Sequence, residues 1–283
     1  MGKIVLAAKI THVPTMLMSE KPGRIFGTRQ QAIDGHYEIV RRAREAGVDT
    51  VVVFDSHWLI NAGYHINSGE HFKGLYTSHE FPQFIQDMEY EYTGNKALGD
   101  AIAKKAMQKG VHTESHNIES LTLEYGTLVP MYFMNKERDL KVVSVAALCT
   151  VHSHDSSIKL GEAVAEAIAE SDSNVMILAS GSLSHGMWAN EDYAANNGTF
   201  TISSEFNQQM DLHVIELWKQ GRHKEFLKLL PEYASKCDGE GNMHDTAMLY
   251  GAVGGVNYEG KCELIGEYFP SSGTGQVNMI FPV

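Results

Sequence analysis

Three histidines and one glutamate are the residues of this chain whose types and placement predict a metal site. His12, His57 and His185 each follow an apolar run that is typical of a buried strand. Glu240 lies in a turn between two glycines. Because ligands of an open α/β sheet bind at the carboxyl ends of its strands, we expect these side chains to meet at one edge of one sheet.

Two imidazoles and one carboxylate on one face of a metal ion leave adjacent coordination positions open, as in the non-haem Fe(II) oxygenases. His12, His57 and Glu240 would supply that face. The site would keep a single net positive charge, with room for an anionic bidentate substrate beside dioxygen. An imidazole outside the coordination shell can accept and return a proton near neutral pH, and His185 is the candidate for this role. The same ligands suit Mn(II), so both metals stay open.

Ligands that are dispersed along a chain form no local motif, so each histidine also has an ordinary structural interpretation. A histidine in a loop or core most often bonds a backbone carbonyl. His152 and His244 are intermediate, because only their place in the sequence brings them near the predicted site. We give the ordinary interpretation to His36, His65, His71, His79, His112, His116, His154, His213 and His223.

Ser184 is the candidate nucleophile of a competing enzyme class, the serine hydrolases. The run Ser182–Gly186 follows a strand and resembles the nucleophile elbow of serine hydrolases, but Ser182 replaces the first glycine of that G-x-S-x-G motif. His185 would also crowd the strained turn, which makes a hydrolase the weaker alternative. A phosphate-binding role for residues 273–275 is rejected, because too few residues follow to form the required helix. A purely structural or binding protein is the general alternative.

Apolar periodicity places these side chains on alternating strands and helices. Predicted strands span 4–8, 51–57, 141–146, 175–179, 263–269 and 276–281, and predicted helices span 29–45, 95–109, 157–170, 223–236 and 243–253, with another from 203. Residues 59–92 are predicted to be irregular, and so long a connection is usually functional. This order predicts an α/β fold over residues 1–283: a single-domain layered α/β/α arrangement with a central mixed sheet and the active site at strand carboxyl ends.

Amino-acid composition excludes some classes of binding partner and indicates a cellular compartment. The formal net charge of −12 argues against nucleic acid and anionic membranes, although a small anionic substrate remains compatible. The three cysteines include no C-x-x-C pair, which argues against a disulfide framework and a thiolate zinc site and favours a reducing compartment. The N-terminus lacks a signal-peptide pattern, and no apolar stretch is long enough to span a bilayer. We therefore expect a cytoplasmic protein.

Five segments that occur in order along the chain are Ile10–Pro14, Phe54–Trp58, Glu124–Pro130, Ser180–His185 and Gly239–Asp245. Together they resemble the class III extradiol ring-cleavage dioxygenases, the protocatechuate 4,5-dioxygenase-like superfamily. The resemblance covers essentially the whole chain. Cys149–His152 and Tyr268–Asn278 look typical of the branch that acts on 3,4-dihydroxyphenylacetate (homoprotocatechuate).

The resemblance implies a role for each candidate residue. His12 and His57 match the family's iron-binding histidines, Glu240 its carboxylate ligand, and His185 its acid/base histidine. The implied cofactor is Fe(II), the implied partners are a catechol and O2, and family members commonly form homo-oligomers. The implied reaction is meta cleavage of 3,4-dihydroxyphenylacetate to 5-carboxymethyl-2-hydroxymuconate semialdehyde in aromatic-compound catabolism. Protocatechuate or a dihydroxyphenylpropionate stays open as the substrate.

Tyr125 departs from the family pattern. Many relatives carry a histidine before the Gly-Thr-Leu-Val-Pro run, and this chain has Tyr125 there. A phenol can donate a hydrogen bond or, if its pKa is depressed, a proton. His185 is therefore the main acid/base candidate, with Tyr125 as its partner. Two roles stay open for Asp55: it can orient a metal ligand, or it can cap the turn.

Overall fold

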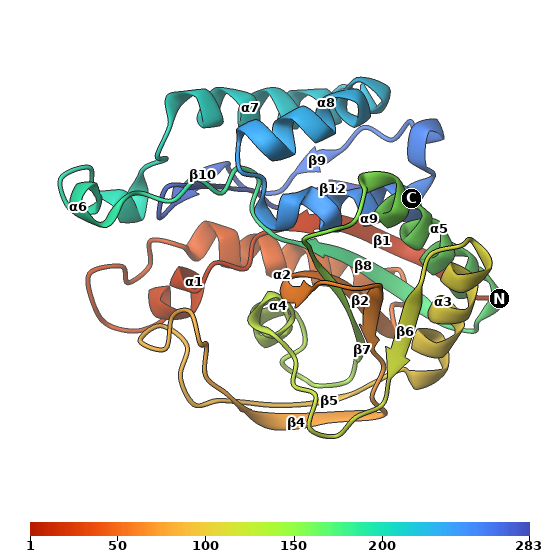
Figure 1. The fold of residues 1–283 in the computed structure, drawn as a ribbon. Helices are drawn as coiled ribbons and strands as arrows, with labels where there is room; N and C mark the ends of the chain where they lie inside the picture. Colours follow the sequence, from red (N-terminus) through yellow and green to blue (C-terminus); the bar gives the residue numbers. More distant parts are fainter.

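Eight strands form one mixed sheet at the centre of the computed structural model, which describes residues 1–283 (Figure 1). In spatial order they are β6 (Thr113–His116), β3 (Tyr64–Asn67), β7 (Lys141–Cys149), β2 (Thr50–Ile60), β8 (Asn174–Ser180), β1 (Lys3–Ile10), β12 (Met279–Phe281) and β9 (Glu263–Leu264). The four central strands β7, β2, β8 and β1 are parallel, whereas β3 and β12 run antiparallel to them. The predicted α/β class with a mixed sheet is confirmed.

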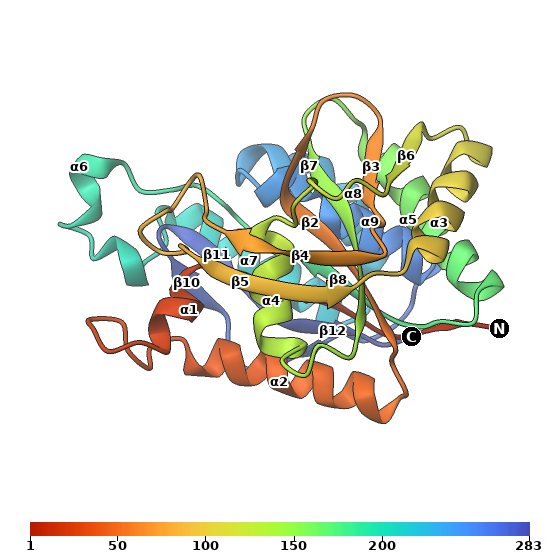
Figure 2. The ribbon, with the colours of Figure 1, turned by 90° about the horizontal axis from the view of Figure 1, so that it is seen from below.

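Helices cover both faces of this sheet, and Figure 2 shows α2 on one side of it and α9 on the other. The longer helices are α2 (Gln30–Glu45), α3 (Lys96–Gln108), α4 (Tyr125–Met134), α5 (His154–Glu170), α7 (Glu205–Lys219), α8 (His223–Lys236) and α9 (His244–Val253). The short ones are α1 (Thr15–Ser19), α6 (Asn190–Tyr193) and the 3-10 turns η1 (Gly198–Phe200), η2 (Glu240–Met243) and η3 (Gly255–Asn257). No helix is both long and apolar enough to cross a bilayer.

The alternating side chains of the strands divide the core into two halves. Val52 and Phe54 of β2 pack in one half, with α3, α5, α7, α8 and α9. Val51 and Val53 pack in the other half, with α2, α4 and the hairpin of β4 (His71–Tyr76) and β5 (Met88–Thr93). Because both faces of β2 are covered, its sequence is a continuous apolar run and not an alternating one.

Two segments differ from the sequence prediction. Residues 59–92, predicted to be irregular, contain β3, β4 and β5, and the polar stretch after Gly110 contains β6. These strands are short, and β4 and β6 each leave some side chains exposed, so no continuous apolar run marks them. The predicted closing strands are also shorter, because the hairpin of β10 (Phe269–Ser271) and β11 (Thr274–Gln276) lies between β9 and β12.

Helices α5 and α9 approach closely through two glycines. A Cβ atom at Gly161 would lie 1.9 Å from the carbonyl oxygen of Met248, and one at Gly251 would lie 2.0 Å from that of Ile158. Each helix therefore places its backbone where the other has no side chain. This contact supports the half of the core beneath η2, which carries Glu240.

We expect Gly161→Ala to destabilise the protein by about 1–3 kcal/mol, because the added methyl group must push the two helices apart. The intrinsic helix preference of alanine would act in the opposite direction by roughly 1 kcal/mol. Urea unfolding measures the effect. Lys159→Ala, on the exposed side of the same helix, is the control and should change stability by less than about 0.5 kcal/mol. A Gly161→Ala protein as stable as the wild type would contradict the packing argument.

Candidate metal centre

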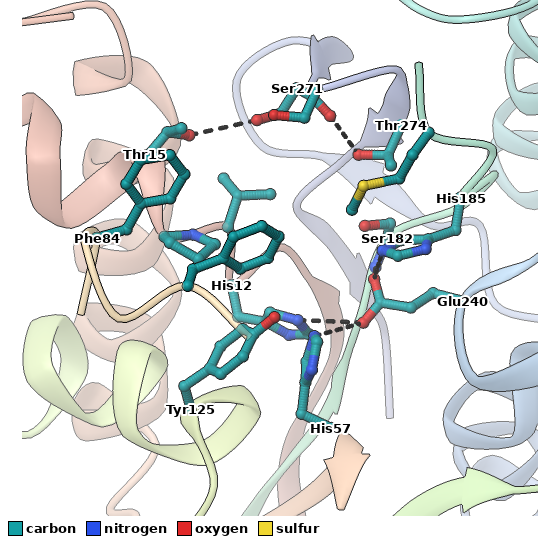
Figure 3. Close-up of a pocket in the computed structure, with 15 residues that line it drawn as sticks. His12, Thr15, His57, Phe84, Tyr125, Ser182, His185, Glu240, Ser271 and Thr274 are labelled. Carbon is teal, nitrogen blue, oxygen red and sulfur yellow. Dashed lines mark hydrogen bonds and ion pairs between the residues drawn. The ribbon is translucent and has the colours of Figure 1, made fainter. Parts of the chain in front are cut away.

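The structure brings together the three residues predicted to bind a metal. The ligand atoms of His12, His57 and Glu240 all lie within 4.8 Å of one another. Oε1 of Glu240 is 3.1 Å from Nε2 of His12 and 3.3 Å from Nε2 of His57. Figure 3 shows the two rings and the carboxylate directed at one point, although they come from three distant parts of the chain.

An irregularity in β2 positions His57. The pairing of β2 with β7 is regular to Asp55 and resumes at Leu59 after a register shift, and such bulges redirect side chains. The Asp55 carboxylate accepts hydrogen bonds from the backbone N–H of His57 at 2.8 Å and from the hydroxyl of Thr127 at 2.6 Å. Asp55 therefore holds the backbone of the bulge, which favours the capping alternative over a direct bond to the His57 ring.

Hydrogen bonds from behind fix the orientation of His12, which lies two residues beyond β1. The Ser180 hydroxyl donates to the carbonyl of Gly126 at 2.5 Å, so its oxygen accepts from Nδ1 of His12 at 2.9 Å. Nε2 of His12 therefore faces Glu240, and in the neutral ring its lone pair would be available to a metal ion. The preceding carbonyl, that of Thr11, accepts a bond from the buried His36 at 3.0 Å.

Glu240 is held as a carboxylate at the centre of the site. Oε1 accepts a hydrogen bond from the Ser56 hydroxyl, and Oε2 accepts one from the backbone N–H of Ser182. Burial alone would raise the pKa of Glu240, but the charges of His12 and His185 and the bonds from the histidines lower this pKa well below its usual range. The side chain is only 4% exposed, and its ionisable partners are all histidines.

These donors fit a divalent metal ion. A buried carboxylate needs a compensating cation, and neither lysine nor arginine supplies one to Glu240. Burial lowers the pKa of His57, but the bond to Glu240 and the negative charges of Glu240, Asp55 and Glu80 together outweigh burial and leave the pKa raised. Two imidazole nitrogens and one carboxylate oxygen around a common point form a facial set of three protein ligands.

His185 and Tyr125 lie beside this centre. Nε2 of His185 is 3.8 Å from Oε2 of Glu240. The ring of Tyr125 lies 3.7 Å from that of His57, and its hydroxyl donates to Oε2 of Glu80 at 2.9 Å. Burial and the charge of Glu80 raise the pKa of Tyr125 far above its usual value. Of the two alternatives for this phenol, hydrogen-bond donation therefore fits and ready ionisation does not.

A cavity opens over the centre, and Figure 3 shows hydroxyl groups across it from the metal-ligand side chains. Besides the five predicted site residues, its lining consists of Val13, Pro14, Thr15, Phe81, Phe84, Ser182, Met187, Ser271, Ser272 and Thr274. The sequence drew attention to residues 59–92 as a long connection but not to Phe81 or Phe84 individually. The resemblance drew attention to Tyr268–Asn278, but it gave no role to the hydroxyl groups of the β10–β11 turn.

Ser184 does not form the serine hydrolase site that was the competing prediction. Its hydroxyl donates to Oδ2 of Asp211 at 2.8 Å, and its backbone N–H donates to Oδ1 at 3.2 Å. Tyr233 and Tyr268 donate to the same carboxylate. Ser184 is completely buried, and its hydroxyl bonds an acid and not the histidine base that a serine nucleophile requires.

His152 and His244 have partners away from the centre. Nε2 of His152 bonds the carbonyl of Gly63 at 2.7 Å, and Nδ1 of His244 lies 2.7 Å from the Ser157 hydroxyl. His244 is completely buried in α9. Neither ring takes part in the metal-ligand set.

Comparison with known proteins agrees with this geometry. Residues 6–282 match the family described as the catalytic LigB subunit of aromatic ring-opening dioxygenase. The chain is 55% identical over 261 residues to 3,4-dihydroxyphenylacetate 2,3-dioxygenase of Escherichia coli, covering 92% of this chain and 94% of that one. It is 26% identical over 258 residues to the 2-aminophenol 1,6-dioxygenase beta subunit of a Pseudomonas species, covering 84% and 82% of the two chains.

A solved structure shares the fold. An uncharacterized protein from Escherichia coli K12 superposes with a TM-score of 0.63 at 14% sequence identity. The match covers 98% of this chain and 99% of that one, so it extends over the whole α/β arrangement.

Acidification should destabilise the metal-free protein in part through His244. Burial and the neighbouring His154 lower the pKa of His244 from 6.5 to about 3 in the folded state. The unfolded chain therefore takes up this proton first, and stability is lost as the pH falls from about 6.5 toward 3, by up to roughly 1.4 kcal/mol per pH unit.

Glutamine does not titrate, so His244→Gln removes this proton uptake. We therefore expect the free energy of unfolding to fall less steeply between pH 6.5 and 4. Urea unfolding in the presence of a chelator measures the slope for both proteins. His213→Gln on the exposed face of α7 is the matched control and should shift stability by less than about 0.5 kcal/mol. Parallel pH profiles for the wild type and His244→Gln would contradict the assignment.

Proposed function

This chain belongs to the family of catalytic LigB subunits of aromatic ring-opening dioxygenases, and we propose that it opens the ring of 3,4-dihydroxyphenylacetate with O2 by extradiol cleavage. The product would be 5-carboxymethyl-2-hydroxymuconate semialdehyde. One observation carries the proposal: the facial set of His12, His57 and Glu240 lies in a cavity lined by aromatic and hydroxyl groups. The name of the Escherichia coli relative supports the choice of substrate.

We propose that His12, His57 and Glu240 bind Fe(II), with Mn(II) as the ion that the same donors also accept. Three protein ligands leave coordination positions for both catechol oxygens and for O2. When bound, the metal supplies Lewis acidity toward the phenol groups and the redox chemistry that O2 requires.

The acid/base role falls to His185 in this proposal. Its Nε2 faces the cavity 3.8 Å from Oε2 of Glu240, beside the position that the catechol oxygens would occupy. It can therefore take a phenolic proton and return it later in the reaction. Tyr125 keeps its proton, packs its ring against His57, and can donate its hydroxyl proton to a substrate oxygen by exchanging its bond to Glu80.

The far end of the cavity suits the carboxylate of the substrate. The hydroxyl groups of Thr15 and Ser271 lie 3.3 Å apart there. Behind them the buried Arg29 donates to Oγ1 of Thr15 at 3.2 Å and to the carbonyl of Thr199 at 2.8 Å, with no carboxylate partner. An uncompensated guanidinium makes this end of the cavity positive, despite the net negative charge of the protein.

A second cavity adjoins the first and extends this positive region. Both cavities are lined by Thr15, Phe84 and Ser272, and the second also contains Lys21 and Arg24. An anionic substrate that enters by this route meets cations before it reaches the metal ligands. We infer that the second cavity is the entrance to the active site.

We also propose that the enzyme works in the cytoplasm, which the three unpaired, buried cysteines support. Assembly into a homo-oligomer stays a prediction.

The proposed reaction is tested with protein loaded anaerobically with Fe(II) or Mn(II). We expect one O2 to be consumed per 3,4-dihydroxyphenylacetate, with formation of a yellow product. The neutral 4-methylcatechol should show a kcat/KM at least tenfold lower, because a lost charge-assisted hydrogen bond is worth roughly 1.5 kcal/mol or more. Absence of O2 uptake with either metal would refute the reaction. A higher kcat/KM for protocatechuate or a dihydroxyphenylpropionate would refute the substrate.

The assigned roles predict two classes of variant. His12→Ala, His57→Ala and Glu240→Ala should fail to retain metal after dialysis, because each removes one of three ligands. His185→Gln should retain the metal and lose a factor of about 10² to 10⁴ in kcat. Metal analysis and O2 uptake on the same samples separate the two classes, with exposed His71→Ala as the control that keeps both properties. Loss of metal from His185→Gln would show that the roles are misassigned.

A further inference from the structure

The outer edge of the sheet carries a second group of metal-ligand side chains. His65 of β3 and Glu114 and His116 of β6 have ligand atoms that all lie within 4.8 Å of one another. None of these residues lines the active-site cavity. From the sequence alone, His65 and His116 have the ordinary interpretation of loop or core histidines, whereas the structure places their rings against each other.

Strand pairing explains why these side chains converge. β3 and β6 are parallel, with His65 opposite Glu114 and Asn67 opposite His116. Side chains two residues apart on a strand share a face, so His112, Glu114 and His116 project to the same side. The intervening side chain of Ser115 faces away and donates to Asp100 of α3. The run His-Thr-Glu-Ser-His thus presents alternate ligand groups along one face.

The hydrogen bonds of His65 leave one ring nitrogen available to a metal. Its Nε2 lies 3.1 Å from the carbonyl oxygen of Ala62, and since a carbonyl only accepts, Nε2 carries the proton. Nδ1 of His65 therefore carries no proton. Its lone pair faces Nε2 of His116, and the two nitrogens are 2.8 Å apart. Burial and the adjacent His116 lower the pKa of His65, which keeps the ring in the neutral form that coordinates metals.

We propose that His65, Glu114 and His116 bind a divalent ion of the zinc type, namely Zn²⁺, Ni²⁺ or Cu²⁺. The ion replaces the proton that His116 donates to His65, and this proton moves to Nδ1 of His116, so that both rings bind as neutral imidazoles. Tetrahedral coordination at 2.0–2.1 Å requires the two nitrogens to separate to about 3.3 Å, which a small rotation of the rings achieves. His112 is the candidate fourth ligand, because its Nε2 is 3.6 Å from Oε1 of Glu114.

Exposure and ligand type distinguish this site from the catalytic one. His112 and Glu114 have side chains that are 65% and 56% exposed, so both can move to meet an ion. An imidazole-rich surface site favours ions late in the first-row series over Fe(II). Because its ligands belong to two neighbouring strands, a bound ion joins the edge strand β6 to β3. The Trp58 ring, 6.3 Å from that of His65, can report on binding.

Zinc stoichiometry tests the proposal. Chelator-treated full-length protein is dialysed against micromolar ZnCl2, and the bound metal is counted. We expect two ions per chain in the wild type, one in His12→Ala, one in His65→Ala/His116→Ala, and none when all three substitutions are combined. Zn²⁺ should raise the Tm of His12→Ala and leave that of the combined variant unchanged. Glu114→Gln in the His12→Ala protein should weaken zinc binding at least tenfold.

Controls separate a lost ligand from a lost fold. His65→Ala/His116→Ala should keep O2 uptake with Fe(II), and His71→Ala/His213→Ala, which removes two exposed histidines elsewhere, should still bind two ions. The proposal is overturned if the wild type binds a single ion that His12→Ala loses, or if His65→Ala/His116→Ala binds as much zinc as the wild type.

Discussion

The negative charge of Glu240, buried among histidines, is the constraint around which the active site is built. A carboxylate that is almost fully out of water is stable only when hydrogen bonds and positive charge surround it. Ser56 from β2 and the backbone of Ser182 after β8 satisfy its oxygens, and imidazoles from two further segments face it. The same charge that makes the site costly to fold makes it a strong site for a divalent cation.

Hydrogen bonds from the surrounding core hold the two histidine ligands and their backbone in place. Asp55 bonds the backbone of His57, and Thr127 bonds Asp55 in turn. Ser180 bonds the ring of His12, and His36 bonds the carbonyl just before it. These contacts come from β8, which is a central strand of the sheet, and from α2 and α4, which pack on the sheet. The geometry of the ligands is therefore held in advance by the core, which is how outer contacts tune metal sites.

Much of the fold could be predicted because strands and helices depend on local patterns, whereas the roles of the dispersed site residues came from the resemblance to a known family. Val51 to Phe54 read as a strand buried on both faces, and the polar residues that follow mark its carboxyl end. What could not be predicted depends on pairing between distant segments. The bulge after Asp55 is a matter of register against β7, and the partner of Ser184 is a carboxylate in α7. The convergence of His65 and His116 required the pairing of β3 with β6, two strands without a continuous apolar run.

The dispersion of the metal ligands has a consequence for biosynthesis. His12 and His57 leave the ribosome early, whereas Glu240 and the strand β12, which pairs with β1, belong to the last part of the chain. A nascent chain cannot assemble the three-ligand face until Glu240 has been translated, long after His12 and His57. A metal ion that needs all three ligands can therefore be acquired only after these distant segments have come together.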